Sequence, residues 1–178
     1  ALCVYEEIMA SEVQNWLSGK LENTRLDDGV TYTAIADFCV MWAVFEGAEL
    51  ADADSAVDEL AYVACRLVKD HIDFSEELAF WSNRYIEEGA TNKPFDKLGF
   101  THKPHIKLVS DVLLGNQTDA LKVAHAILLI VYRLRNNLFH GNKDITQIHN
   151  QVTNLDMASK ALINVATVSG RYVFLNNA

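Results

Sequence analysis

The sequence has few residues that interrupt helices, with two prolines and eight glycines among 178 residues. Short strands and tight turns depend on such residues, so this scarcity disfavours an all-β fold and favours a helical one. The longest uncharged apolar run, residues 123–132, is shorter than the roughly 18–20 residues that span a membrane. Half of the residues are hydrophobic, which suits a single core of ordinary size. We therefore predict one all-α domain over residues 1–178 and no membrane partner.

Cysteine is also sparse. Cys3, Cys39 and Cys65 are odd in number, widely spaced and never arranged as C-x-x-C. This pattern fits reduced thiols in a cytosol better than a disulfide framework or a zinc site. No basic leader with an apolar core is visible at the start of the chain, so we expect no targeting signal and a cytoplasmic location.

Positive charge is outnumbered, and the formal net charge is −9. Such a total argues against a polyanionic partner, but the charge is unevenly distributed. Residues 1–90 carry 19 acids and five bases, whereas residues 91–178 carry five acids and ten bases. This asymmetry indicates that part of the second half faces a polyanion. Lys103 and Lys107 are candidate RNA-binding residues there, although lysines in such a stretch also serve simply to solubilise a loop.

Helical spacing of apolar residues predicts a compact bundle of about six to seven helices. We expect these helices over residues 4–18 and 33–51, from Ser55, from Ser75 to Gly89, from Pro104 to Gly115, from Thr118 to Phe139 or His140, and from Asp144 to about Val173. Residues 89–103 are expected to form a loop. The helix from Thr118 is nearly all apolar in its middle, which places it at the centre of the bundle. The last helix carries an apolar seam that either docks inside the bundle or pairs two subunits.

Three polar residues share one face at the end of the apolar helix that starts at Thr118. At about 100° per residue, Arg133, Asn136 and His140 lie opposite the core-facing residues. Histidine titrates near neutrality and transfers protons, while the planar fork of arginine binds phosphate oxygens. These are the groups that a metal-independent phosphodiesterase needs. Alternatively, His140 is a helix-terminal histidine that interacts with the helix dipole.

Arg135 points differently, along the apolar flank of the same helix beside Phe139. A buried guanidinium needs a partner, because an unpaired charge is costly. Glu46 lies among apolar residues of an early helix, and we predict that it pairs with Arg135. Glu46→Gln and Arg135→Ala should then destabilise the fold equally. The residues alone leave a structural ion pair and a catalytic role open for Arg135.

His102 and His105 raise the question of a metal. No cysteine or carboxylate joins them at ligand spacing, so we expect ordinary loop histidines. We therefore predict no metal site and no cofactor.

The segment R-N-N-L-F-H-G, from Arg135 to Gly141, resembles the R-x4-H signature of the HEPN superfamily. The asparagine after the arginine and the glycine after the histidine are especially similar to the Apea-like branch. The all-helical pattern and the W-A-V-F-E segment from Trp42 to Glu46 agree with this resemblance.

The resemblance implies a helical bundle that forms a homodimer, in which two copies of the motif face a shared cleft. Many such proteins are metal-independent endoribonucleases that act as toxins or effectors in abortive-infection or toxin–antitoxin systems. His140 would then be the acid/base group, Arg135 would stabilise the phosphorane or hold the site together, and Asn136 would orient either one. Asn137, like Glu46 and Arg133, is expected to support the site.

The implied reaction is attack of an RNA 2′-OH on the adjacent phosphate, which leaves a 2′,3′-cyclic phosphate. Single-stranded RNA is the natural substrate because its 2′-OH and bases are accessible. Arg133 and Lys143 would add phosphate affinity that weakens with salt. An antitoxin or regulatory protein is a further implied partner.

One departure from the family concerns regulation. Some HEPN toxins carry a tyrosine two residues after the histidine, where a partner nucleotidyltransferase modifies it, and this sequence has Asn142 there. The second function class is a catalytically inactive HEPN module that binds nucleotide, RNA or a protein partner. The third is a helical scaffold of unrelated function.

Overall fold

The computed structural model describes residues 29–51, 53, 55–139 and 145–172, together with positions 12, 13, 15 and 16. The helices are α2 (Gly29–Glu49), α3 (Ala56–Lys69), α4 (Ser75–Tyr85), α5 (Lys93–Asp96), α6 (Lys103–Leu113), α7 (Ala120–Phe139), the 3-10 helix η1 (Ile145–Gln151) and α8 (Val152–Val168). The two short strands β1 (Ile86–Glu87) and β2 (Ala90–Thr91) form an antiparallel pair. The predicted all-α bundle is confirmed. Within the described residues, no helix combines the length and the apolar character needed to cross a membrane.

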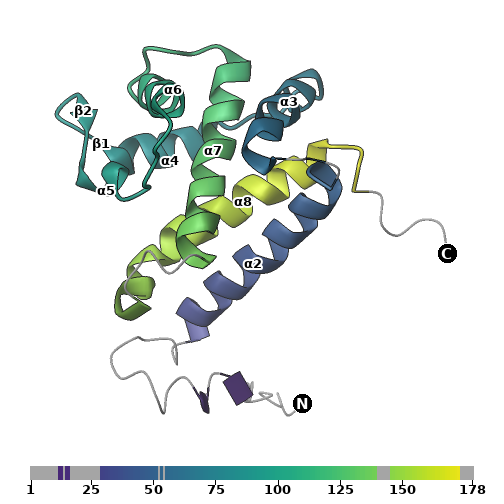
Figure 1. The fold of residues 1–178 in the computed structure, drawn as a ribbon, viewed down its shortest axis with the longest axis vertical. Helices are drawn as coiled ribbons and strands as arrows, with labels where there is room; N and C mark the ends of the chain where they lie inside the picture. The colour runs from purple at the N-terminus through teal and green to yellow at the C-terminus, as the bar shows by residue number, and fades with distance from the viewer. Residues whose placement is uncertain are drawn as a thin grey trace, which may run out of the picture.

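Helix α7 stands at the centre of the bundle, as its apolar sequence predicts (Figure 1). Every residue from Ala126 to Val131 is buried, so this segment is covered on all sides rather than along one stripe. Helix α7 lies between α3 and α6 and packs against both of them. The C-terminal end of α7 therefore follows directly after a long buried segment of the same helix.

Helices α2 and α8 lie side by side and run in the same direction (Figure 1). The buried side chains of α2 include Ala34, Phe38, Trp42 and Phe45, which follow the spacing of one helical face. Leu155, Ser159 and Leu162 of the predicted seam on α8 are also buried. Because α8 packs most extensively on α2, the seam docks inside the bundle.

The last predicted helix is wrong in extent. Instead of one helix from Asp144 to Val173, the 3-10 helix η1 precedes α8, and α8 ends at Val168. Asparagine and glutamine side chains dominate the junction, and Asn154 Nδ2 donates to Gln151 Oε1 at 3.1 Å. Such polar side chains compete with regular helix formation, which explains the change of helix type.

The predicted loop over residues 89–103 contains regular structure, and the preceding helix stops earlier than expected. Helix α4 ends at Tyr85, before β1. The chain then reverses through Glu88 (φ 50°) and Gly89 (φ 77°), and two positive φ angles in succession are typical of a tight hairpin turn. At α7, Asp119 Oδ1 accepts from Lys122 N at 3.1 Å, so Asp119 caps this helix rather than Thr118.

Before residue 29, the structure describes positions 12, 13, 15 and 16. Most of the helix predicted over residues 4–18 lies outside the described residues, although the four described positions are helical. Helix α2 begins at Gly29 rather than Thr33.

Candidate functional site

The polar end of α7 carries the predicted site residues in its last two turns. Arg133, Arg135, Asn136 and Asn137 belong to α7, whereas His140 and Lys143 lie outside the described residues.

Arg135 is held by a carboxylate and two aromatic rings. Its Nη2 lies 3.7 Å from Glu46 Oε1, which confirms the predicted pairing between α2 and α7. Its guanidinium carbon lies 5.6 Å from the ring centroid of Trp42 and 5.2 Å from that of Phe139, which is cation–π distance. The Arg135 side chain is 26% exposed and that of Glu46 is 45% exposed. The guanidinium is thus fixed in orientation and still reaches the surface.

Asn136 links Arg135 to the interior of the site. The Asn136 residue is 8% exposed, and its Oδ1 accepts from Arg135 Nη1 at 3.2 Å. This contact agrees with an orienting role for Asn136.

Arg133 and Asn137 attach the segment before α6 to α7. Arg133 Nε donates to the carbonyl of Leu98 at 2.9 Å, and Asn137 Nδ2 donates to the carbonyls of Lys97 and Leu98, both at 3.2 Å. Gly99 between them has φ +70°, and a Cβ there would lie 3.1 Å from Arg133 Nη2. Asn137 is only 3% exposed, so its supporting role is structural.

A pocket of about 330 Å³ opens beside the buried face of Asn136. It lies between the start of α3, the segment that enters α6, and α7. Its lining comprises Val57, Asp58, Phe100, Thr101, His102, His105, Leu129, Tyr132, Arg133 and Asn136. The pocket therefore brings Arg133 and Asn136 together with Asp58 and the two histidines, a grouping that sequence patterns did not predict.

His102 and His105 are part of a small histidine cluster rather than a plain loop. The ring centroids of His102 and His105 lie 4.4 Å apart, and His125 lies 6.0 Å from His105. Burial and the neighbouring His105 lower the pKa of His125 to about 4. Burial followed by the charge of His102 lowers the pKa of His105, against the opposing effect of Asp58. Across the described ranges, no three His, Cys, Asp or Glu residues are grouped to hold a metal ion.

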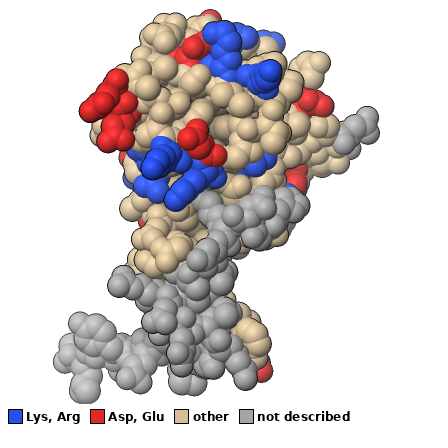
Figure 2. Space-filling view, turned by 60° about the vertical axis from the view of Figure 1, so that its left-hand side comes forward, with Lys and Arg blue, Asp and Glu red and all other residues tan. Residues whose placement is uncertain are grey.

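The lysines predicted to bind RNA differ in their surroundings. Lys107 Nζ lies 2.6 Å from Asp111 Oδ2, so its charge is already compensated on the surface. Lys103 is exposed in the first turn of α6 and has no ion pair with a described residue. Figure 2 shows that Lys and Arg on this side of the molecule form separate groups with acidic side chains near them. The surface is therefore mixed in sign rather than uniformly basic.

Sequence patterns missed a buried carboxylate on α2. The Glu49 side chain is 1% exposed, and its Oε2 lies 2.9 Å from Arg66 Nη2. Its Oε1 accepts from Ser169 Oγ at 2.7 Å. Arg171 Nε lies 4.0 Å from Glu49 Oε2. This cluster connects α2, α3 and the end of α8, and we assign it a structural role. Its position among apolar residues one turn after Glu46 was the available signal.

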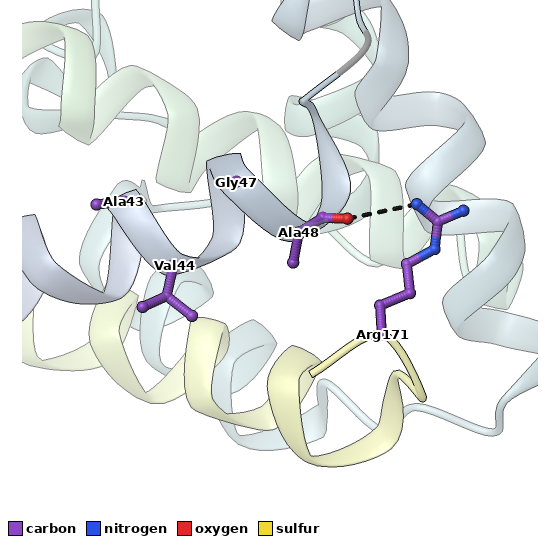
Figure 3. A pocket seen from close by; sticks show the side chains of 5 residues that line it. All are labelled: Ala43, Val44, Gly47, Ala48 and Arg171. Atoms are coloured by element: carbon purple, nitrogen blue, oxygen red, sulfur yellow. Dashed lines mark hydrogen bonds between the residues drawn. The ribbon is translucent and has the colours of Figure 1, made fainter. Parts of the chain in front are cut away.

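A second, open pocket of about 750 Å³ lies along the outer face of α2. Figure 3 shows its lining, in which small and apolar residues follow α2 and Arg171 lies near Ala48, to whose carbonyl its Nη1 donates at 3.4 Å. Ala43, Val44, Gly47, Ala48 and Arg171 line it. These residues include no acid, base or nucleophile beyond one arginine, so the pocket beside Asn136 is the better candidate for chemistry.

No family model matches the chain, and neither the curated proteins nor the solved structures contain a significant match to it.

Proposed function

We propose that the chain is a metal-independent endoribonuclease of the HEPN type that cleaves single-stranded RNA. The observation that carries the proposal is the fixed, partly exposed guanidinium of Arg135 at the end of α7, shortly before His140 in the sequence. A preoriented arginine can bind two phosphate oxygens in a fork. Its position supports a role in stabilising charge that develops on a phosphorane.

The proposed reaction needs proton transfer at two oxygens. A neutral His140 accepts the proton of the 2′-OH while the 2′ oxygen forms a bond to phosphorus. The bond from phosphorus to the 5′ oxygen breaks, and that oxygen takes a proton from a protonated histidine. The products are a 2′,3′-cyclic phosphate and a 5′-hydroxyl. Histidine suits both roles because its ordinary pKa lies near neutrality.

A homodimer would supply both histidines from one shared cleft. Phe139 at the end of α7 is 54% exposed, and it stacks against Arg135. An apolar ring beside the motif is suited to burial against a second copy. An antitoxin or regulatory protein would act by covering the same cleft, and cytoplasmic action in a defence or stress system belongs to the same proposal.

The test uses the full chain, the His140→Ala variant and labelled single-stranded RNA in EDTA. We expect the wild-type protein to cleave and the variant to lose at least about 100-fold in rate, as removal of an acid/base group does. His71→Asn is the matched control, because it replaces a histidine outside the motif and asparagine tolerates the positive φ of 61° there. Circular dichroism must show that all three proteins are folded. Equal cleavage by His140→Ala, or no cleavage without divalent cations, would contradict the proposal.

The second candidate is a catalytically inactive module that binds nucleotide, RNA or a protein. The observation in its favour is that Arg135 already contacts Glu46 and two aromatic rings, as expected of a structural arginine. RNA binding without cleavage by either protein would select this candidate.

A further inference from the structure

The pocket beside Asn136 has a lining of mixed chemistry. Arg133 contributes a cation, Asp58 a carboxylate, and His102 and His105 two imidazoles. A site for a bare phosphate would be expected to exclude a carboxylate, because like charges repel. Hydrogen-bond donors and acceptors side by side instead suit a neutral planar ligand whose edge carries both donors and acceptors. Nucleobases have such edges.

Two aromatic side chains, each partly covered by other residues, line the pocket. Phe100 and Tyr132 line the pocket, and both are partly exposed. Arg133 lies 5.9 Å from the ring centroid of Phe100, while its Nε is committed to the carbonyl of Leu98. The guanidinium plane is therefore held in place at the wall of the pocket. Bases of single strands stack on aromatic rings and on guanidinium planes in this manner.

Asn136 connects the pocket to the motif. Its Oδ1 accepts from Arg135 Nη1, and Asn136 also lines the pocket, so one amide side chain contacts both the arginine and the pocket. Occupation of the pocket would then hold the amide that contacts Arg135. The volume of about 330 Å³ lies at the low end of the roughly 300–1,000 Å³ found for ligand sites, which limits the ligand to about one nucleotide.

We propose that this pocket binds one nucleobase of a single-stranded RNA and so places the neighbouring phosphate at Arg135. The inference rests on the proposed function, since it assigns part of the same substrate. Lowered basicity of His105 agrees with it, because burial and His102 favour the neutral imidazole, which can both donate and accept. The choice of base would then be determined by His102, His105 and Asp58.

The test is calorimetric binding of the four ribonucleoside 5′-monophosphates to the full chain, with ribose 5-phosphate as the probe without a base. We expect at least one mononucleotide to bind at millimolar concentration or below, and ribose 5-phosphate to bind at least about tenfold more weakly. Asp58→Asn should weaken the best mononucleotide about tenfold, the usual effect of losing one hydrogen bond to a charged group. Asp37→Asn is the matched control, since Asp37 is exposed on α2 and does not line the pocket.

Absence of binding by all four mononucleotides would overturn the pocket assignment, as would equal binding of ribose 5-phosphate. An equal loss in Asp37→Asn and Asp58→Asn would overturn it too. The outcome separates from that of the proposed function. RNA cleavage without mononucleotide binding refutes the pocket alone, whereas base-dependent binding without cleavage refutes the nuclease and leaves the pocket.

Discussion

Two carboxylates one turn apart on α2 each meet an arginine from another helix, and their surroundings differ. The Glu49 side chain is 1% exposed and lies 2.9 Å from Arg66. The Glu46 side chain is 45% exposed and lies 3.7 Å from Arg135. A short, buried pair contributes to the fold, while a longer, exposed pair contributes little stability. Glu46 therefore orients Arg135 and leaves it accessible, whereas Glu49 holds three elements together.

Glu49→Gln should produce the largest loss of stability. The substitution replaces the carboxylate that Arg66 and Ser169 contact with a neutral amide. The amide NH2 group can then point toward the Arg66 guanidinium, which is itself a donor. We expect the free energy of unfolding to fall by about 2 kcal/mol, at the level of a charged hydrogen bond with a partner that is partly exposed. Urea unfolding measures this, with Glu87→Gln on the exposed hairpin as the control. If Glu49→Gln and Glu87→Gln were equally stable, the proposed difference between Glu49 and Glu46 would be wrong.

Arg135→Ala should have an intermediate effect. The substitution removes two cation–π contacts and the ion pair with Glu46. Exposed cation–π contacts contribute about 0.5–1 kcal/mol each and an exposed ion pair adds little, so we expect a loss of about 1–2 kcal/mol in the same urea experiment. Lys107→Ala, whose ion pair with Asp111 lies on the surface, is the control. A loss no greater than that of Lys107→Ala would show that the aromatic contacts of Arg135 contribute nothing.

Glu46→Gln should have the smallest effect, below about 1 kcal/mol, because surface ion pairs are weak. Equal destabilisation by Glu46→Gln and Arg135→Ala was the expectation from sequence, and the exposure of Glu46 argues against it. The loss of unfolding free energy caused by Glu46→Gln should be smaller in 1 M NaCl than at low salt, since salt screens exposed charges. A deficit that matches Glu49→Gln, or one that salt does not change, would contradict this account.

Helical regularity explains which parts of the site could be predicted. Both Glu46 and Arg135 lie inside long helices, so spacing alone places each on a face, and the pairing follows. The central position of α7 follows from its apolar middle for the same reason. His140 and Lys143 lie outside the described residues, and their roles stay predictions.

Long-range contacts explain what could not be predicted. The partners of Glu49 include Ser169 at the end of α8, and no local pattern connects these two residues. The pocket joins Asp58, His102 and Asn136 from three separate elements. The 3-10 helix η1 depends on a polar segment whose apolar spacing still resembled that of a continuous helix. Sequence periodicity identifies faces but not which faces meet.

The chemistry of the RNA ends tests most directly the proposal that Arg135 and His140 cleave RNA without a metal. Single-stranded RNA digested by the full chain in EDTA should carry 2′,3′-cyclic phosphates and 5′-hydroxyls, and these ends should be absent after incubation with His140→Ala. Products with 5′-phosphates and 3′-hydroxyls, or intact RNA after incubation with the wild-type protein, would contradict the account.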